Sequence, residues 1–180
     1  MNLNNNLVWI DLEMTGLEVK KDVILEIACI ITDGNLNNIV EGPSLVIHQS
    51  EDVLVSMEAW PKQHHTQSGL LERVRASSIF TEQAEEQIMM FIRQYCSPGT
   101  GLLAGNSVWQ DRIFLQAYMP RILKHLHYRI IDVTSVKELV AHWYPNDPHV
   151  KFEKKDAHRA LQDIQESIAE LKHFRTYFFV

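Results

Sequence analysis

The sequence has few cysteines, no excess of basic residues and no long apolar run. Its two cysteines, Cys29 and Cys96, lie far apart, which argues against a disulfide scaffold and favours a reducing compartment. No apolar stretch approaches the ~18 residues that a membrane-spanning helix needs. Residues 1–6 carry four asparagines and no basic cluster ahead of an apolar run, so we expect no targeting segment and a soluble, cytoplasmic protein.

The balance of charge limits the partners of the chain. Its 17 Lys and Arg residues are outnumbered by 23 Asp and Glu residues, and the net charge is −6. A protein that binds long duplexes usually has a basic surface, because neutralised phosphates supply its affinity. If this chain binds nucleic acid, we therefore expect it to do so at a local, metal-loaded site on short pieces.

Length and composition are those of one globular domain. The chain has 180 residues, of which 46% are hydrophobic and 22% charged. These values exclude a disordered, collagen-like or low-complexity chain, and this length can bury a substantial core. Since no linker divides the sequence, we expect a single domain over residues 1–180.

The first half of the sequence predicts strands. Apolar, β-branched runs occur at 7–10, 23–31 and 40–48, and the turn residues Asp33-Gly34 follow the second run. Pro43 weakens the third run, as in an edge strand. The short spacers favour an antiparallel meander.

The second half alternates between helical and strand patterns. A helix with Thr81 as its N-cap carries apolar residues at helical spacing through Tyr95. The further predicted elements are a strand at 102–104, a helix at 107–118, a strand at 129–133, a helix at 134–143, a loop at 144–155 and a last helix that begins near Asp156. Together the elements predict an α/β fold in which helices cover the faces of a mixed sheet.

Two acidic residues end the first predicted strand. Asp11 and Glu13 are two apart, so their side chains point to the same face, where like charges repel. A divalent cation relieves that repulsion, and oxygen ligands suit Mg²⁺ or Mn²⁺. Because D-x-E is common, the pair alone favours a simpler interpretation, a polar strand end before a turn.

Further candidates lie in the predicted helices. Asp111 lies early in the helix after the 102–104 strand, where α/β sheets bind ligands, although an acid there also complements the helix dipole. His158 and Asp163 are five apart, which is ~500° and ~7.5 Å on a continuous helix, so they would not be joint ligands of one ion. If His158 lies at the helix start, Asp163 could bind metal while His158 contacts an attacking water. Singly, a solvent-facing histidine and a flanking aspartate explain them as well.

The combination and order of these residues resemble a known family. W-I-D-L-E-M-T-G-L (9–17), G-N-S-V-W-Q-D-R-I-F-L (105–115) and H-R-A-L-Q-D-I (158–164) resemble the three motifs of the DEDDh exonucleases. The segments 59–74 and 128–139 are similar to the oligoribonuclease family within that superfamily. The resemblance covers effectively the whole chain. Its departures are few, namely Glu18 in place of an expected Asp, and Trp109 and Ile113 at variable positions.

The resemblance implies a ribonuclease H-like fold and a 3′→5′ exoribonuclease of very short RNA, especially dinucleotides. It assigns the metal-site carboxylates to Asp11, Glu13, Asp111 and Asp163, and the general base to His158. Phosphodiester hydrolysis needs an activated water and a neutralised leaving oxygen, and two Mg²⁺ or Mn²⁺ ions ~3.5–4 Å apart would supply both. Histidine suits the proton transfer because its pKa of ~6.5 lies near working pH.

The resemblance also implies contacts to the bases and the phosphate. Leu17 and Trp60 would sandwich the bases, and His65 would contact the substrate. Without it, Trp60 would be a half-buried core residue, Leu17 a loop anchor and His65 an exposed polar histidine. Ser107 follows Gly105-Asn106 at a predicted helix start, where it can offer a hydroxyl or amide to a phosphate, act as an N-cap, or do both.

A cap on the 5′ phosphate of the substrate is implied as well. It would consist of Tyr128, Arg129, Thr134 and Ser135, with at least Tyr128 and Arg129 coming from a second subunit. The resemblance therefore predicts a homodimer whose site is completed in trans and whose closed cap limits substrate length. Without it, Tyr128-Arg129 would be a strand start and Thr134 an N-cap.

Other functions remain open at this point. A proofreading-type DNA exonuclease shares the scaffold, but the Trp60 and Tyr128-Arg129 segments argue against it. A non-catalytic nucleotide-binding module would be expected to lack an acidic ligand. A structural α/β domain would leave the ordered motifs unexplained.

Overall fold

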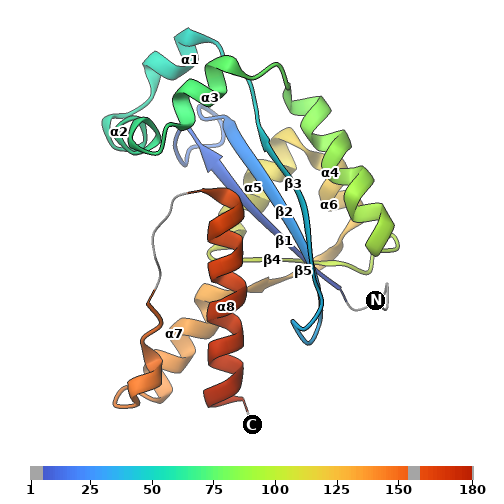
Figure 1. Cartoon of the computed structure of the whole chain (residues 1–180), viewed down its shortest axis with the longest axis vertical. Coiled ribbons are helices and arrows are strands. Elements are labelled where there is room, and N and C mark those ends of the chain that lie inside the picture. The colour runs from blue at the N-terminus through green and yellow to red at the C-terminus, as the bar shows by residue number, and fades with distance from the viewer. Residues whose placement is uncertain (1–5, 154–158, 180) are drawn as a thin grey trace.

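A mixed five-stranded sheet forms the centre of the protein (Figure 1). The computed structural model describes residues 6–153 and 159–179. The strands are β1 (Asn6–Met14), β2 (Ile24–Asp33), β3 (Ile39–Val46), β4 (Leu102–Gly105) and β5 (His127–Asp132), in the order β3-β2-β1-β4-β5. The first three form the predicted antiparallel meander, and β4 and β5 run parallel to β1. The predicted mixed α/β fold is therefore confirmed.

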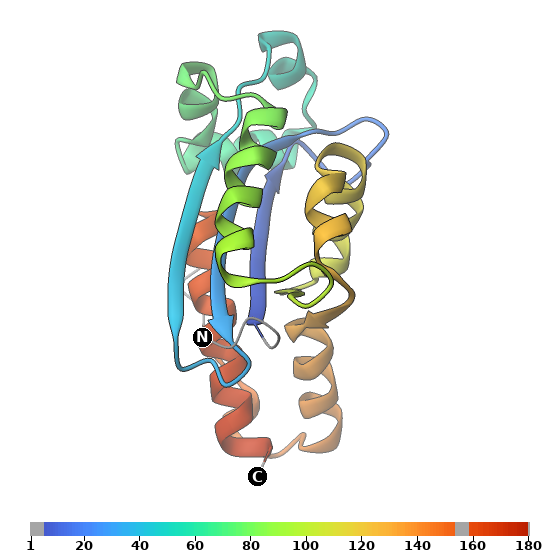
Figure 2. The ribbon, with the colours of Figure 1, turned by 90° about the vertical axis from the view of Figure 1, so that its right-hand side faces the viewer.

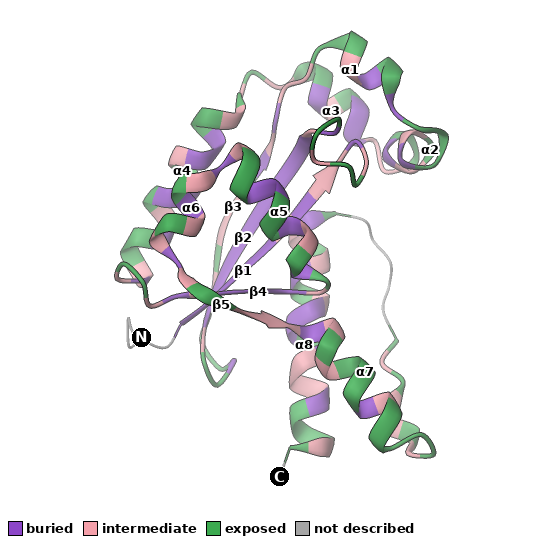
Figure 3. Cartoon of the chain, turned by 180° about the vertical axis from the view of Figure 1, so that it is seen from behind, coloured by how far each residue is buried: buried purple, intermediate pink, exposed green. Residues whose placement is uncertain are grey.

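Helices cover both faces of this sheet. They are α1 (Glu51–Ser56), α2 (Ala59–Gln67), α3 (Leu70–Ala76), α4 (Thr81–Tyr95), α5 (Val108–Tyr118), α6 (Pro120–His125), α7 (Val133–Trp143), the 3₁₀ helix η1 (Pro148–Val150) and α8 (Ala160–Phe178). In the side view, α4 lies in front of the sheet and α8 behind it (Figure 2). Coloured by burial, the central strands are largely buried and α7 is mostly exposed (Figure 3). Within the described ranges, no helix has the length and apolar character needed to cross a membrane.

The pleat of β1 divides the core into two layers. Val8, Ile10 and Leu12 point to the layer that contains α4, α5 and α6. Leu7 and Trp9 point to the opposite layer, which contains α8. Since side chains alternate along a strand, the next odd-numbered residues of β1 also face α8.

Both cysteines lie in the first of these layers. Cys29 and Cys96 are buried among its apolar side chains, and both are free. They therefore serve as small apolar core residues.

Three short helices lie where the sequence predicts no element. α1, α2 and α3 cover one end of the sheet, and apolar side chains of α1 and α3 pack in one cluster with Leu25 of β2. Helices of this length are marginal in isolation. Their stability therefore comes from packing on β2 and β3, which the local pattern does not reveal.

Several predicted helix boundaries differ from the observed ones. Thr81 is the first residue of α4, where the Phe80 N–H donates to Gln83 Oε1 at 2.9 Å. Asp132, not Thr134, caps α7, since its Oδ1 accepts the Thr134 N–H at 2.9 Å. The predicted start of the last helix, near Asp156, lies outside the described residues, and η1 interrupts the predicted loop.

Candidate active site at the carboxyl ends of parallel strands

The candidate site lies where β1, β4 and β5 end side by side. Trp9 of β1 pairs with Ala104 of β4, and Gly105 pairs with Asp132 of β5. Because the three strands are parallel, their carboxyl ends meet at one edge, the usual ligand position in α/β sheets. The chain segments that follow these ends carry most of the predicted site residues.

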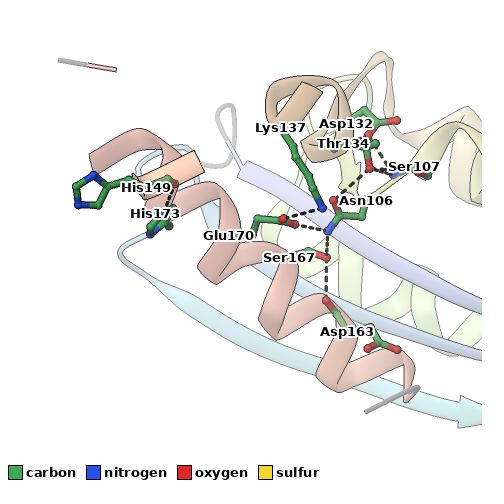
Figure 4. Close-up of polar contacts among 10 residues, drawn as sticks. All are labelled: Asn106, Ser107, Asp132, Thr134, Lys137, His149, Asp163, Ser167, Glu170 and His173. Carbon is green, nitrogen blue, oxygen red and sulfur yellow. Dashed lines mark hydrogen bonds and ion pairs between the residues drawn. The ribbon is translucent and has the colours of Figure 1, made fainter. Parts of the chain in front are cut away.

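Carboxylates from two distant segments converge at this edge. Asp11 and Glu13 continue the α8-facing row of β1. Asp163 lies in the first turn of α8, as Figure 4 shows. One oxygen from each of the three carboxylates lies within 4.8 Å of the others. The pleat and the packing of α8 thus bring together residues about 150 positions apart in the sequence.

Asp111 lies beside this cluster. It occupies the first turn of α5 and is buried, and its Oδ1 accepts the Leu12 N–H at 3.0 Å. The β1 backbone therefore holds Asp111 between the positions of Asp11 and Glu13. His158, the predicted general base, lies outside the described residues.

Burial and mutual repulsion raise the pKa values of these acids. Burial raises the pKa of Asp11 well above its usual range, and Asp111, Glu13 and Asp163 raise it further. The pKa of Glu13 is raised to about 8, first by burial and then by Asp163 and other neighbouring carboxylates. Burial likewise raises the pKa of Asp111 to about 7, although the hydrogen bond from Leu12 opposes the shift. A divalent cation would remove this repulsion, so the donor set is consistent with divalent metal binding.

An ion pair missed by the sequence analysis lies next to the cluster. Glu26 of β2 is the cross-strand partner of Glu13 and is only 2% exposed. Arg73 of α3 donates to both of its carboxylate oxygens, at 3.1 and 3.3 Å. This pair ties α3 to the sheet beside the site, and Arg73 lowers the pKa of Glu13. A charged residue inside an otherwise apolar strand was the available signal.

A cavity of about 460 Å³ extends from Glu13 toward α2. Leu17 and Trp60 line it and remain 69% and 75% exposed, so Trp60 is not the half-buried core residue of the alternative interpretation. The Trp60 ring stacks on His64, with centroids 5.2 Å apart. Two large apolar surfaces thus stand free beside the acidic cluster.

His65 is buried, in contrast to the exposed position of the alternative interpretation. It is 4% exposed, and its Nε2 lies 2.8 Å from the Met14 carbonyl oxygen. Its Nδ1 lies 3.8 Å from Glu13 Oε2. The interpretation as an exposed polar histidine is therefore wrong, and the ring links α2 to the end of β1.

Ser107 and Thr134 meet at the other side of the site. The Ser107 N–H donates to Asp132 Oδ1 at 3.0 Å and to Thr134 Oγ1 at 2.9 Å. Ser107 occupies the N-cap position of α5 in a left-handed conformation, without a capping bond from its side chain. Thr134 and Ser135 line a cavity of about 510 Å³ together with Trp109.

Tyr128 and Arg129 do not join these residues within one chain. They lie near the start of β5, whereas Asp132 ends the strand, ~13 Å farther along from Tyr128. Tyr128 is 70% exposed, and the Arg129 guanidinium lies 5.4 Å from the centroid of its ring. The predicted phosphate cap is thus divided between two separate places on the chain.

The raised pKa values predict how pH affects the metal-free protein. In the folded state, Glu13 and Asp111 keep their protons up to about pH 8 and pH 7, whereas in the unfolded chain they release them near pH 4. The stability that this difference contributes is complete below pH 4 and is lost as pH rises toward 8. Asp11→Asn removes one repelling charge and should raise the unfolding free energy at pH 8 by ~1–2 kcal/mol, since one pKa unit corresponds to ~1.4 kcal/mol. Urea unfolding in EDTA at pH 5 and pH 8 measures this.

The control for that measurement is Asp52→Asn, which changes an exposed acid on α1. It should shift stability equally at both pH values. A wild-type protein that gains stability over this range relative to Asp11→Asn would contradict the predicted repulsion.

Comparisons with known proteins agree with this geometry. The exonuclease family model, RNase_T, matches residues 8–171. An oligoribonuclease of Ruthia magnifica subsp. Calyptogena magnifica is 53% identical over 99% of this chain and 98% of the relative. The mitochondrial oligoribonuclease of Homo sapiens is 51% identical over 99% of this chain and 75% of the relative.

Solved structures share the fold at low identity. E. coli exonuclease I in complex with a dA16 oligonucleotide superposes with a TM-score of 0.74 at 17% identity, covering 97% of this chain. Exonuclease I of Methylocaldum szegediense gives 0.69 at 20% identity, also over 97% of this chain. The chain spans 41% of each of these two structures. The predicted ribonuclease H-like fold is thereby confirmed.

Proposed function

The chain belongs to the oligoribonuclease family of exonucleases, and from this membership we propose that it hydrolyses very short single-stranded RNA from the 3′ end, dinucleotides above all, to 5′-mononucleotides. The observation that carries the proposal is the convergence of Asp11, Glu13 and Asp163 within 4.8 Å. We propose that residues 1–180 form one exonuclease domain and that it works in the cytoplasm, which the two free, buried cysteines support.

The acidic cluster has the chemistry that phosphodiester hydrolysis needs. When bound, two Mg²⁺ or Mn²⁺ ions supply charge neutralisation at the scissile phosphate and help to activate the attacking water. Asp11, Glu13 and Asp163 would hold them, with Asp111 beside them. His158 is the proposed acceptor of the proton from the attacking water, a role that suits an imidazole near neutral pH.

The cavity beside Glu13 suits nucleotide bases. Leu17 and Trp60 are exposed apolar surfaces on its two walls, and stacking of a base on an aromatic ring contributes ~1–3 kcal/mol. His65, buried between Met14 and Glu13, would keep α2 in register with the metal site and contact the substrate from there. Affinity for the substrate then does not depend on a basic surface.

We assign the 5′ phosphate to Ser107, Thr134 and Ser135 of one subunit, with Tyr128 and Arg129 of a second. The separation of Tyr128 from Ser107 within one chain supports a contribution in trans. Exposed apolar side chains beside Thr134 and Ser135, Trp109 at 54% and Leu139 at 45%, support a dimer interface there. Sedimentation that detects a fully active monomer would contradict the dimer.

A length series tests the proposed activity. RNA oligomers of two to ten nucleotides, labelled at the 5′ end, should be shortened from the 3′ end, with the dinucleotide cleaved fastest, and EDTA should stop the reaction. Matched DNA oligomers serve as competitors. Faster cleavage of DNA or of longer RNA would favour a proofreading-type exonuclease, and binding without cleavage would favour a nucleotide-binding module.

The loop that carries Leu17 depends on Asp22. Asp22 Oδ1 accepts the Thr15 hydroxyl at 2.9 Å, and its Oδ2 accepts the Glu18 N–H at 2.9 Å. A Cβ on Gly16 would clash with Oδ2 and displace this carboxylate. The loop holds Leu17 against the cavity through these two bonds.

Asp22→Ala should therefore raise the KM for a dinucleotide by ~10-fold, the order expected when charge-assisted hydrogen bonds are lost. Gly16→Ala should act in the same direction. Steady-state kinetics measure both, and the kcat should change little, because neither residue joins the acidic cluster. The exposed Asp52→Ala is the control. An unchanged KM in both variants would contradict the role of this loop.

A further inference from the structure

A polar network joins the proposed phosphate side of the site to α8 (Figure 4). Its centre is Asn106, the first residue after β4. Asn106 Nδ2 donates to Ser167 Oγ at 2.7 Å and to Glu170 Oε2 at 3.0 Å. On its other side, Asn106 Oδ1 accepts the Thr134 hydroxyl at 3.2 Å. One amide therefore spans from α8 to α7.

The bond to Asn106 determines what Thr134 can do. A threonine hydroxyl has one proton and two lone pairs. The proton is directed to Asn106, and one lone pair accepts the Ser107 N–H at 2.9 Å. The Ser107 hydroxyl lies 3.1 Å from the same Oγ1. Because the Thr134 proton is directed to Asn106, the Ser107 hydroxyl is the donor in this contact, and Thr134 thus orients Ser107. A bound phosphate would receive the Ser107 proton in place of Thr134 Oγ1.

The α8 end of the network is rigid. Glu170 is fully buried, and Lys137 Nζ lies 3.5 Å from its Oε1. Ser167 Oγ donates to the Asp163 carbonyl at 2.8 Å, which leaves its lone pairs for Asn106. Buried polar groups of this kind are costly unless they have polar partners, and the bonds to Ser167 and Glu170 fix the position of the Asn106 amide. Through its bonds to Asn106, α8 therefore holds residues 106–107 in position.

Ser107 needs such support because of its backbone. Its φ of 48° lies in the left-handed region, which non-glycine residues adopt at a cost in energy. Such residues persist where several contacts determine their conformation together, and they cluster at ligand sites. Here Asp132 and Thr134 accept its N–H, and Asn106 holds Thr134.

We propose that Asn106, anchored on Ser167 and Glu170 of α8, is a positioning residue that fixes Ser107 and Thr134 for recognition of the 5′ phosphate of the substrate. This inference rests on the proposed function. It assigns the direct contact to Ser107 and makes Thr134 the residue that orients it. Selectivity for a 5′-phosphorylated end then depends on an amide that does not touch the substrate.

The test compares a dinucleotide that carries a 5′ phosphate, pApA, with ApA, which has a 5′ hydroxyl. Asn106→Ala should lower the ratio of kcat/KM for pApA to that for ApA by ~10-fold, mainly through the KM for pApA. Ser167→Ala should act in the same direction and serves if Asn106→Ala does not fold. Glu170→Gln, whose amide oxygen can still accept from Asn106, should retain the wild-type ratio.

Thr176→Val is the matched control. Thr176 also lies on α8, and its hydroxyl donates to the carbonyl of the residue four positions earlier, Lys172, at 2.9 Å, as Ser167 does to Asp163. Only Ser167 also accepts from Asn106. An equal loss on both dinucleotides in Asn106→Ala, or a ratio like that of Thr176→Val, would overturn the inference.

Amide hydrogen exchange gives a readout that needs no substrate. The Ser107 N–H should exchange faster in Asn106→Ala and Ser167→Ala than in Thr176→Val, because Thr134 is then released. If the wild type cleaves neither dinucleotide, the proposed function fails. The positioning role is then tested by hydrogen exchange alone. Protection of the Ser107 N–H that is the same in Asn106→Ala as in Thr176→Val would refute it.

Discussion

Asp163→Ala should reduce the kcat for a dinucleotide by at least ~10³-fold at saturating metal, since loss of even an outer-shell partner of a metal costs about 10–100-fold. Asp163 comes from α8, whereas Asp11 and Glu13 come from β1. Its carboxylate lies with theirs inside 4.8 Å, so its removal opens the cluster on one side. Single-turnover kinetics across a Mn²⁺ titration separate weaker metal binding from slower chemistry.

Gln162→Ala is the control for this variant, because Gln162 is the exposed neighbour of Asp163 on the same helical turn. It should leave turnover close to that of the wild type. Turnover of Asp163→Ala within tenfold of wild type would exclude Asp163 from the site, and the family assignment of its role would then not apply to this chain.

Trp60→Ala should raise the KM for a dinucleotide by ~5–150-fold, the range that corresponds to ~1–3 kcal/mol of base stacking. The ring is 75% exposed, so little core packing is lost. We therefore expect the unfolding free energy to stay within ~0.5 kcal/mol of the wild-type value. Trp60→Phe keeps an aromatic face and should recover most of the affinity.

Phe80→Ala provides the comparison for Trp60→Ala. Phe80 is 52% exposed and does not line the cavity beside Glu13. Its loss should leave the KM unchanged. A KM that rises equally in both variants, or a stability loss that explains the kinetics of Trp60→Ala, would count against a stacking role.

The strongly periodic elements could be predicted because their signals are local. The meander of β1 to β3 follows from apolar runs with short spacers, and α8 follows from its buried stripe. The helices α1 to α3 could not be predicted in this way. They are short, and α2 buries only Pro61 and His65, so their formation depends on contacts with the sheet.

The candidate site, like the fold, could be predicted from the sequence only where its signals are local. The orientation of Asp11 and Glu13 follows from the period of a strand, and the motif order supplied their partners. The Glu26–Arg73 pair joins residues 47 positions apart, and the bond from Asn106 to Glu170 joins residues 64 apart. No local pattern links such residues. The burial of His65 could not be predicted for the same reason, since its partners Met14 and Glu13 belong to a distant strand.

The functional consequence is a separation of roles along the chain. In the proposed function, the segment after β1 and α2 is assigned the bases, the edge of β1 and the start of α8 are assigned the metal, and the ends of β4 and β5 are assigned a phosphate. The Leu17 loop is held by bonds within itself, whereas His65 and Ser107 are held by bonds to neighbouring elements. Variants of the supporting residues should therefore change substrate preference before they change the fold.

The most direct test of this account is a crystal soaked in Mn²⁺ and measured for anomalous scattering. We predict anomalous density for Mn²⁺ between the carboxylates of Asp11, Glu13 and Asp163, and its loss in Asp11→Asn. Well-ordered carboxylates with no anomalous density beside Asp11 and Asp163 would contradict the central claim, because the acids would then meet for a reason other than metal binding.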